Sequence, residues 1–312
     1  MGKTCSYFYP RGTNMVSNDS HVKKALFGGY PTQDQVYLLE NMGVKWFVDL
    51  TLGNEKRTTP YIVTNKDKYI AYPIVDQCVP SDIVGFVKFI NKLVSIISSL
   101  TDNEKLYIHC KGGHGRSGLI VATLMCVMDE IGPERAIRDT TTSHNQRHMM
   151  KRKWKKIGSP QTRDQCRFLH SLFESQNIEY NIYLSPSSPH SVVLTYKILQ
   201  DTEYEIKEEG TFSELKIHPS SNYKDVTTVF ETAYHAIYYM MQLNPNQSQS
   251  EFRQSVEFVL NNKFLQHPEC MQRLLETGFR QLQCTFPMDG SDEWNCIGTI
   301  YIKLRNIYYN QL

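Results

Sequence analysis

Hydrophobic positions in the first half of the chain alternate between short apolar runs and longer amphipathic stretches. The apolar runs have the length of buried strands and occupy 25–27, 44–51, 70–74 and 106–108. The stretches with helical spacing occupy 31–42, 82–100 and 116–128. An alternation of strands and helices predicts a parallel sheet with helices on its faces. We therefore expect an α/β domain with a central, mostly parallel sheet.

Two later features mark the end of this domain. Residues 132–156 predict one or two helices that end in a basic cluster at 151–156, and a last helix spans 161–174. We interpret the cluster either as a solvated helix face or as a positive rim that steers anionic substrates. Residues 179–191 are rich in proline and serine, a composition typical of a linker. The predicted domains are therefore 1–178 and 192–312, joined by this linker.

The second domain shows mainly helical periodicity. One apolar strand is predicted at its start, at 192–198, and the predicted helices follow at 230–241, 251–264, 268–276 and 297–309. No internal repeat is visible in this half. We expect a mainly α-helical α+β domain.

The stretch with the strongest chemical character is KLYIHCKGGHGRSGLIVATLMCVM, at 105–128. An apolar strand ends at Cys110, a glycine-rich loop follows, and Arg116 and Ser117 open an apolar helix. The N–H groups of such a loop and the helix dipole bind an anion and favour the thiolate form of Cys110. The planar guanidinium of Arg116 grips two oxygens of a phosphate. The pattern predicts covalent hydrolysis of phosphate esters by a cysteine nucleophile.

The alternative interpretation of this stretch is a buried core cysteine and an unrelated surface arginine. The glycines favour catalysis, because they stand where a loop needs positive φ or a close approach to an anion. The residues that we expect around the phosphoryl group are His109, Lys111, Gly112, Gly113, His114 and Gly115.

Composition adds limits of its own. The net charge of +2 predicts neither a nucleic-acid partner nor a membrane partner, and the 8 cysteines show no metal-ligand spacing. With no signal peptide, they indicate a reducing, cytoplasmic location, and we expect no cofactor. Met1-Gly2-Lys3-Thr4-Cys5-Ser6 fits a myristoylation pattern that would give weak, reversible membrane association. An ordinary N-terminus is the favoured alternative.

His109-Cys110-x5-Arg116-Ser117 resembles the signature of cysteine-dependent tyrosine and dual-specificity phosphatases, and the resemblance extends over about 20–175. It includes FGGYP (27–31), VDLT (48–51) and YPIVD (72–76). It implies a general acid on a separate loop, because the leaving oxygen must be protonated. Asp76 matches that position, and Asp82 is the runner-up, with a helix N-cap as its alternative role.

The same resemblance suggests residues for the second step. The segment 160–165 is similar to a glutamine loop, in which Gln161 would position the hydrolytic water, although helix capping explains its polarity equally well. Ser117 would hydrogen-bond the departing thiolate, and His109 would orient the loop. Lys111 and His114 permit a phosphoinositide substrate. No long phosphotyrosine-recognition loop is visible between 51 and 70, which favours the dual-specificity type.

The second half carries, in this order, Glu231-x-x-Tyr234-His235-Ala236, His267-Pro268-Glu269, Leu274-Leu275-x-Thr277-Gly278 and Trp294. This order resembles the NADAR family, whose members include an N-glycosidase acting on riboflavin-pathway intermediates. The resemblance covers about 192–312 and is diffuse. It implies that Glu231 assists N-glycosidic cleavage, Lys263 binds a phosphate, Asp292 bonds the ribose or base, and Trp294 stacks on the base. The tryptophan loop is shorter than in the family.

The sequence therefore predicts a protein phosphatase of the tyrosine or dual-specificity class, joined to a domain that hydrolyses nucleotide or ADP-ribose derivatives. Its expected partners are a phosphorylated protein or another phosphomonoester and, in the second domain, a nucleotide or ADP-ribose ligand. The alternative is a phosphoinositide or RNA 5′-phosphatase with a non-catalytic nucleotide-binding module.

Overall fold

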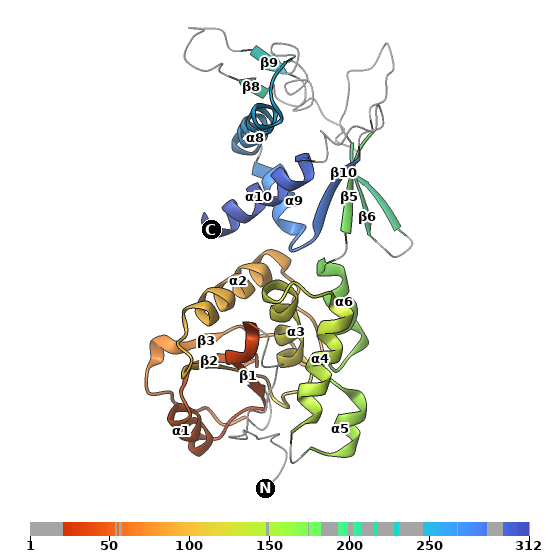
Figure 1. Cartoon of the computed structure of the whole chain (residues 1–312). Coiled ribbons are helices and arrows are strands. Elements are labelled where there is room, and N and C mark those ends of the chain that lie inside the picture. Colours follow the sequence, from red (N-terminus) through yellow and green to blue (C-terminus); the bar gives the residue numbers. More distant parts are fainter. Residues whose placement is uncertain are drawn as a thin grey trace. The chain divides into compact units, whose positions relative to one another are not determined.

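Figure 1 shows the computed structural model of the chain. It describes residues 21–53, 55, 58–147, 150–173, 175–181, 193–198, 202–206, 215–217, 228–230, 246–266, 268–285 and 296–311. Two compact units make up the chain, Met1–Phe173 and Glu174–Leu312. No helix among the described residues is both long enough and apolar enough to cross a membrane.

A four-stranded parallel sheet forms the centre of the first unit. Its strands are β1 (Ala25–Gly28), β2 (Val44–Asp49), β3 (Tyr69–Ala71) and β4 (Lys105–His109), in the spatial order β1-β4-β2-β3. All three pairings are parallel. The carboxyl ends of the strands therefore share one edge, where open α/β sheets bind their ligands.

Helices cover both faces of this sheet (Figure 1). On one face, α1 (Gln33–Asn41) packs Val36 and Leu39 against Phe47 of β2 and Tyr107 of β4. Successive strand residues point to opposite faces. Leu106 and Ile108, both fully buried, therefore face the side that is opposite to Tyr107.

The central helix of the first unit is α3 (Arg116–Met128), which is buried from Arg116 through Cys126. It contacts η1 (His21–Lys24), α2 (Ile83–Ser99), α4 (Pro133–Asn145) and α6 (Arg163–Phe173). The short helices η2 (Lys66–Lys68) and α5 (Arg152–Ile157) complete the described elements. Because α3 is enclosed by neighbours, the loop that leads into it is held in a fixed position.

The predicted α/β architecture of this unit is confirmed, and the boundaries differ by a few residues. The helix expected at 31–42 begins two residues later, because Thr32 caps it in a capping box with Gln35. The strand expected at 70–74 ends at Ala71. Tyr72 and Ile74 still donate to carbonyls of Asp49 and Leu50, so the chain stays beside β2 without forming a longer ladder.

The second unit contains a mixed sheet and three described helices. The sheet has the order β10-β5-β6-β7, with β10 (Gln281–Thr285) parallel to β5 (Ser175–Asn181) and antiparallel pairing between β5, β6 (Val193–Ile198) and β7 (Thr202–Ile206). A separate antiparallel pair joins β8 (Leu215–Ile217) and β9 (Thr228–Phe230). The helices α8 (Gln249–Gln266), α9 (Pro268–Glu276) and α10 (Cys296–Gln311) pack together, and α10 also contacts β10.

The sequence underestimated the strand content of this unit. It predicted β6 and the three helices within a few residues, but it missed β5, β7, β8, β9 and β10. QLQCT of β10, TEYEI of β7 and NIEYN within β5 all alternate, but each stretch holds only two apolar residues, which is a weak signal for a strand. The expected linker begins at residue 179, although β5 continues to Asn181. Of the helix expected at 230–241, Phe230 belongs to β9, and the rest lies outside the described residues.

Candidate active site

The loop from Cys110 to Gly115 connects β4 to α3 at the carboxyl edge of the sheet. The backbone N–H of Cys110 donates to the carbonyl of Gly28, which ties the loop to β1. Gly113 has φ +72, and a Cβ there would lie 2.3 Å from the backbone carbon of Gly28. Only glycine fits this position, because the backbone is left-handed and two chain segments touch.

Cys110 lies at the floor of the loop with 3% of its surface exposed. Its Sγ accepts a hydrogen bond from the N–H of Gly113 at 3.3 Å and lies 3.6 Å from Oγ of Ser117. Ser117 is in the first turn of α3, where the helix dipole favours negative charge. A thiolate at Cys110 therefore has a backbone donor, a hydroxyl donor and a helix N-terminus around it.

Arg116 is the largest fully buried side chain of the described residues, with 1% exposed. Its Nη1 donates to the carbonyls of Leu50 at 3.3 Å and Ile74 at 2.8 Å. Its Nε is buried and has no hydrogen-bond partner. Since an unsatisfied buried N–H is costly, this donor fits a phosphoryl oxygen that enters the loop.

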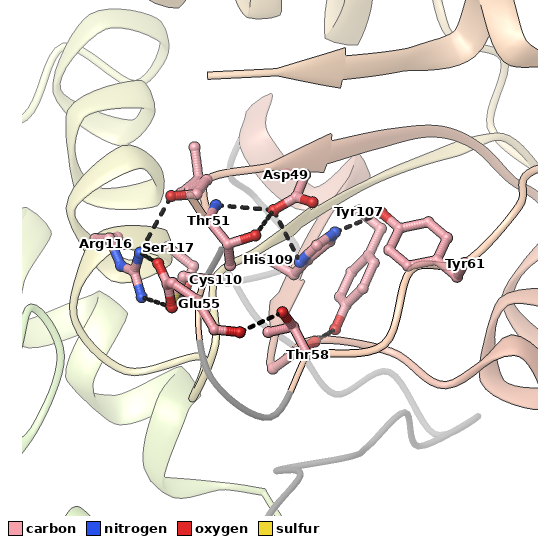
Figure 2. Close-up of polar contacts among 12 residues, drawn as sticks. Asp49, Thr51, Glu55, Thr58, Tyr61, Tyr107, His109, Cys110, Arg116 and Ser117 are labelled. Carbon is pink, nitrogen blue, oxygen red and sulfur yellow. Dashed lines mark hydrogen bonds and ion pairs between the residues drawn. The ribbon is translucent and has the colours of Figure 1, made fainter. Parts of the chain in front are cut away.

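Glu55 and Asp76 hold the same guanidinium (Figure 2 shows Glu55). Glu55 forms a fork, with Oε1 on Nη1 and Oε2 on Nη2 at 3.1 Å, and only 8% of its side chain is exposed. Burial raises the pKa of Glu55, but hydrogen bonds and charge from Arg116, together with the charge of Lys111, lower it overall. The carboxylate of Asp76 accepts from Nη2 at 2.9 Å.

The loop after β3 thus brings Asp76, the residue predicted as the acid, beside Arg116. Its side chain is 53% exposed, so a leaving group and a proton can reach it. Asp82 instead caps α2, where its Oδ1 accepts from the N–H of Gly85 at 2.9 Å. The geometry therefore favours Asp76 over Asp82.

The glutamine segment at 160–165 hydrogen-bonds to the loop that carries Asp76. Gln165 is fully buried, donates to the carbonyl of Cys78 at 3.1 Å and accepts from the N–H of Gln161. The Cβ of Gln161 lies close to Gly115 of the catalytic loop, since a Cβ added to Gly115 would be 3.3 Å from it. The structure thus places Gln161 beside the catalytic loop and makes Gln165 the structural glutamine.

His109 lies behind the loop and is fully buried. Its Nε2 shares a hydrogen bond of 2.5 Å with the hydroxyl of Tyr61 (Figure 2). Burial lowers the pKa of His109 to about 4, although Asp49 opposes that shift. Asp49 is held by Thr51 and Tyr69. His109 therefore supports the loop from behind instead of facing the phosphoryl group.

His114 also faces away from the expected substrate. Its Nδ1 lies 2.8 Å from Nε2 of His144, and its ring stacks on Trp154 with centroids 4.5 Å apart. Burial and then the charge of Arg147 lower the pKa of His114 to about 4 and that of His144 to about 3. The ring of His114 is therefore neutral at pH 7, so the partial cation considered from the sequence is not available, and Lys111 is the basic side chain of the loop.

Three supporting residues were not predicted from the sequence. Glu55 follows the end of β2, and a carboxylate at the carboxyl end of a parallel strand is a usable signal for a site. Arg147, which donates to the carbonyls of Gly113 at 2.6 Å and Phe27 at 3.0 Å, has no comparable signal. Neither does His144.

Of the residues predicted for the second domain, only Lys263 is described. It lies on α8 with 8% of its surface exposed. Glu231, Asp292 and Trp294 lie outside the described residues. Across the part of the chain that is described, no three His, Cys, Asp or Glu side chains are grouped so that they could hold a metal ion.

A buried cysteine in an anion-binding loop, an arginine with a free donor and a carboxylate on a facing loop define a cysteine-dependent phosphatase. The family model described as "Swiss Army Knife protein, DSP-PTPase phosphatase domain" matches residues 23–169. The predicted tyrosine phosphatase 197R of Invertebrate iridescent virus 6 is 57% identical over 312 residues, which is 100% of this chain and 98% of the viral protein. The chain therefore belongs to the tyrosine and dual-specificity phosphatase family.

Two further comparisons are shorter. The predicted tyrosine phosphatase 067L of Invertebrate iridescent virus 3 is 37% identical over 153 residues, which is 48% of this chain and 62% of the viral protein. The crystal structure of kinase associated phosphatase aligns with a TM-score of 0.33 at 28% identity, over 45% of this chain and 74% of that one.

Replacement of Glu55 tests how far the fork orients Arg116. In Glu55→Gln, the guanidinium of Arg116 loses its bidentate charged partner. Because a displacement of the guanidinium by about 1 Å misaligns the bound phosphate, we expect kcat/KM for an aryl phosphate to fall by about 10- to 100-fold. The control is Glu104→Gln, which removes a carboxylate that accepts from the N–H of Thr101. Higher activity in Glu55→Gln would show that Glu55 competes with the phosphate instead.

The buried histidine pair gives the first unit a pH-dependent stability. Unfolded histidines bind a proton below about pH 6.5, whereas His114 and His144 resist protonation until about pH 4 and 3. The unfolded state therefore binds more protons in this window, and stability falls as the pH falls. Denaturant unfolding of the wild type will show a lower free energy of unfolding at pH 5 than at pH 7. In His144→Gln, this difference between the two pH values will be smaller by about 2 kcal/mol. The control His170→Gln keeps the full loss, and equal losses in both variants would contradict the assignment.

Proposed function

We propose that the first unit is a protein phosphatase that hydrolyses phosphomonoesters through a phosphocysteine intermediate. The thiolate of Cys110 attacks phosphorus, the bond from phosphorus to the ester oxygen breaks, and Asp76 gives its proton to that oxygen. Arg116 and the loop N–H groups bind the phosphoryl oxygens as charge develops on them. Family membership supports the reaction class, and the residue roles are our proposal.

The observation that carries this proposal is the unpartnered, buried Nε of Arg116. The two Nη groups are already occupied by carboxylates and carbonyls, which fix the plane of the guanidinium. The remaining donor belongs to the side chain that opens α3, six residues after Cys110. A tetrahedral oxyanion at the cysteine would supply the missing acceptor.

The second step requires water. Water attacks the phosphorus of phosphocysteine, the phosphorus–sulfur bond breaks, and Asp76, now a carboxylate, takes the proton from the water. Oγ of Ser117, at 3.6 Å from Sγ, donates to the departing thiolate. In this proposal, Gln161 orients the water, which is supported by its Cβ lying beside Gly115.

We propose a phosphoprotein as the substrate, in keeping with the dual-specificity type. A phosphoinositide or a 5′-phosphorylated RNA is the alternative. Lys111 is compatible with a phosphoinositide, because it adds a cation inside the loop. Hydrolysis rates on phosphopeptides, phosphoinositide vesicles and 5′-phosphorylated RNA decide the question, and a phosphopeptide rate that is not the highest would overturn the phosphoprotein proposal.

The roles of Cys110 and Asp76 are tested with leaving groups of different acidity. Cys110→Ser will abolish turnover with the fold intact. Asp76→Asn will lower the rate with phenyl phosphate by about 10²- to 10⁴-fold. The loss with 4-nitrophenyl phosphate will be smaller, because nitrophenolate leaves without full protonation.

The matched control is Asp82→Asn. Asparagine caps a helix about as well as aspartate, so this variant keeps both the fold and the activity if Asp82 only caps α2. Equal losses with both leaving groups in Asp76→Asn, or a leaving-group effect in Asp82→Asn, would remove Asp76 as the acid.

For the second unit, we propose hydrolysis of N-glycosidic bonds in nucleotide or ADP-ribose derivatives, with a binding module as the alternative. The support is the sequence resemblance to the NADAR family, in which Glu231 would assist the cleavage and Lys263 would bind a phosphate. Incubation with riboflavin-pathway intermediates and ADP-ribosylated nucleotides will release base or free ADP-ribose, and Glu231→Gln will prevent it. If calorimetry shows binding of ADP-ribose but no base or ADP-ribose is released from these substrates, the second unit is a binding module.

A further inference from the structure

Five cations lie close together on and beside α5, next to the catalytic loop. They are Lys151, Arg152, Lys153, Lys155 and Lys156, and all five are exposed. Among the residues that the structure describes, none of them forms an ion pair with a carboxylate. Because the whole chain has a net charge of only +2, this cluster, which we call the α5 patch, is a local concentration of positive charge.

The cations of the α5 patch within the helix lie on the side of α5 opposite to Trp154. Successive helix residues are rotated by about 100°, so the four cations within α5 fan over about 160° centred opposite Trp154. Trp154 points the other way and stacks on His114 of the catalytic loop, 4.5 Å between centroids. The Cα–Cβ bonds of these cations therefore point away from the face that touches the loop, although the ammonium group of Lys153 folds back over the ring of Trp154.

Hydrogen bonds keep this helix in place. Asn145 donates to the carbonyl of Lys155 at 3.1 Å, and the hydroxyl of Ser159 donates to the carbonyl of His114 at 2.5 Å. A Cβ on Gly118 would lie 1.9 Å from Oγ of Ser159, so the segment after α5 sits tightly on α3. A surface that binds the α5 patch is thus held next to the loop of Cys110.

Single-stranded nucleic acid fits this surface poorly. Proteins that bind such strands combine cations with aromatic faces on which bases stack. The ring of Trp154 is already covered by His114 and by the ammonium group of Lys153, which lies 5.1 Å from its centroid. No aromatic face of α5 is therefore left for a base.

An anionic lipid bilayer fits it better. Clusters of four to eight Lys and Arg side chains bind acidic lipid headgroups without needing a shaped pocket. We propose that the α5 patch docks the protein on anionic membrane surfaces and presents the catalytic loop to them. This goes beyond the proposed phosphatase reaction.

Vesicle binding tests the proposal on the full chain. The protein carries Gly2→Ala throughout, so that no acyl chain contributes. Co-sedimentation is measured with phosphatidylcholine vesicles and with vesicles that also contain phosphatidylserine, at about 0.1 M salt. We expect binding only to the second kind, and a loss of binding when the salt is raised, because screening weakens exposed charges.

Two triple variants distinguish the effect of where the charges lie from the effect of the total charge on vesicle binding. Lys151→Gln, Lys155→Gln and Lys156→Gln together remove three charges of the α5 patch. Lys45→Gln, Lys66→Gln and Lys92→Gln together remove three exposed charges elsewhere in the first unit. Each cation near an anionic bilayer strengthens binding roughly five-fold, so the first variant loses roughly 100-fold and the second only a few-fold.

Three results would overturn the proposal. They are no binding to phosphatidylserine vesicles, equal binding to neutral vesicles, and equal losses in the two triple variants. Tighter binding to a single-stranded RNA than to the vesicles would also overturn it and assign the patch to nucleic acid. Turnover of an aryl phosphate by the α5 variant shows that its fold is intact. The vesicle result stands whether or not the phosphatase proposal survives.

Discussion

The buried guanidinium of Arg116 is the constraint on which the first unit depends. A charge with 1% of its surface exposed is tolerated only when its hydrogen bonds are supplied. The partners come from the ends of two strands, since Leu50 and Glu55 follow β2, and Ile74 and Asp76 follow β3. The parallel sheet brings these ends to one edge, and the same edge receives the loop after β4. The geometry of the site therefore depends directly on the packing of the sheet.

A second layer holds the loop from behind. Tyr61 bonds His109, Asp49 is held by Thr51 and Tyr69, and Arg147 reaches the carbonyl of Gly113. The histidines of this layer are neutral, because burial outweighs the nearby carboxylate at His109. Neutral rings add no positive charge beside the anion site, so Arg116 and the loop N–H groups remain the main source of attraction.

The parts of the site that are close in sequence were predictable, and the parts assembled by tertiary contact were not. The loop from Cys110 to Ser117 carries its chemistry in consecutive residues, and the strand and helix around it follow from apolar periodicity. Asp76 required a family resemblance. Glu55 is 61 residues from Arg116, and no local pattern indicates that pairing. In the second unit, β5 and β10 each carry only two alternating apolar residues, so the local signal is weak and the two strands are stabilised mainly by their pairing in the sheet.

Charge balance constrains how the site binds a phosphate. In the empty site, the single positive charge of Arg116 faces Glu55 and Asp76. A phosphate dianion beside a thiolate adds further negative charge, and like charges about 4 Å apart repel by about 4 kcal/mol in such surroundings. Glu55 has 8% of its side chain exposed and holds the fork, whereas Asp76 has 53% exposed and meets solvent. The charge of Asp76 is therefore the one that water screens, and its carboxylate is the one that a leaving group can reach.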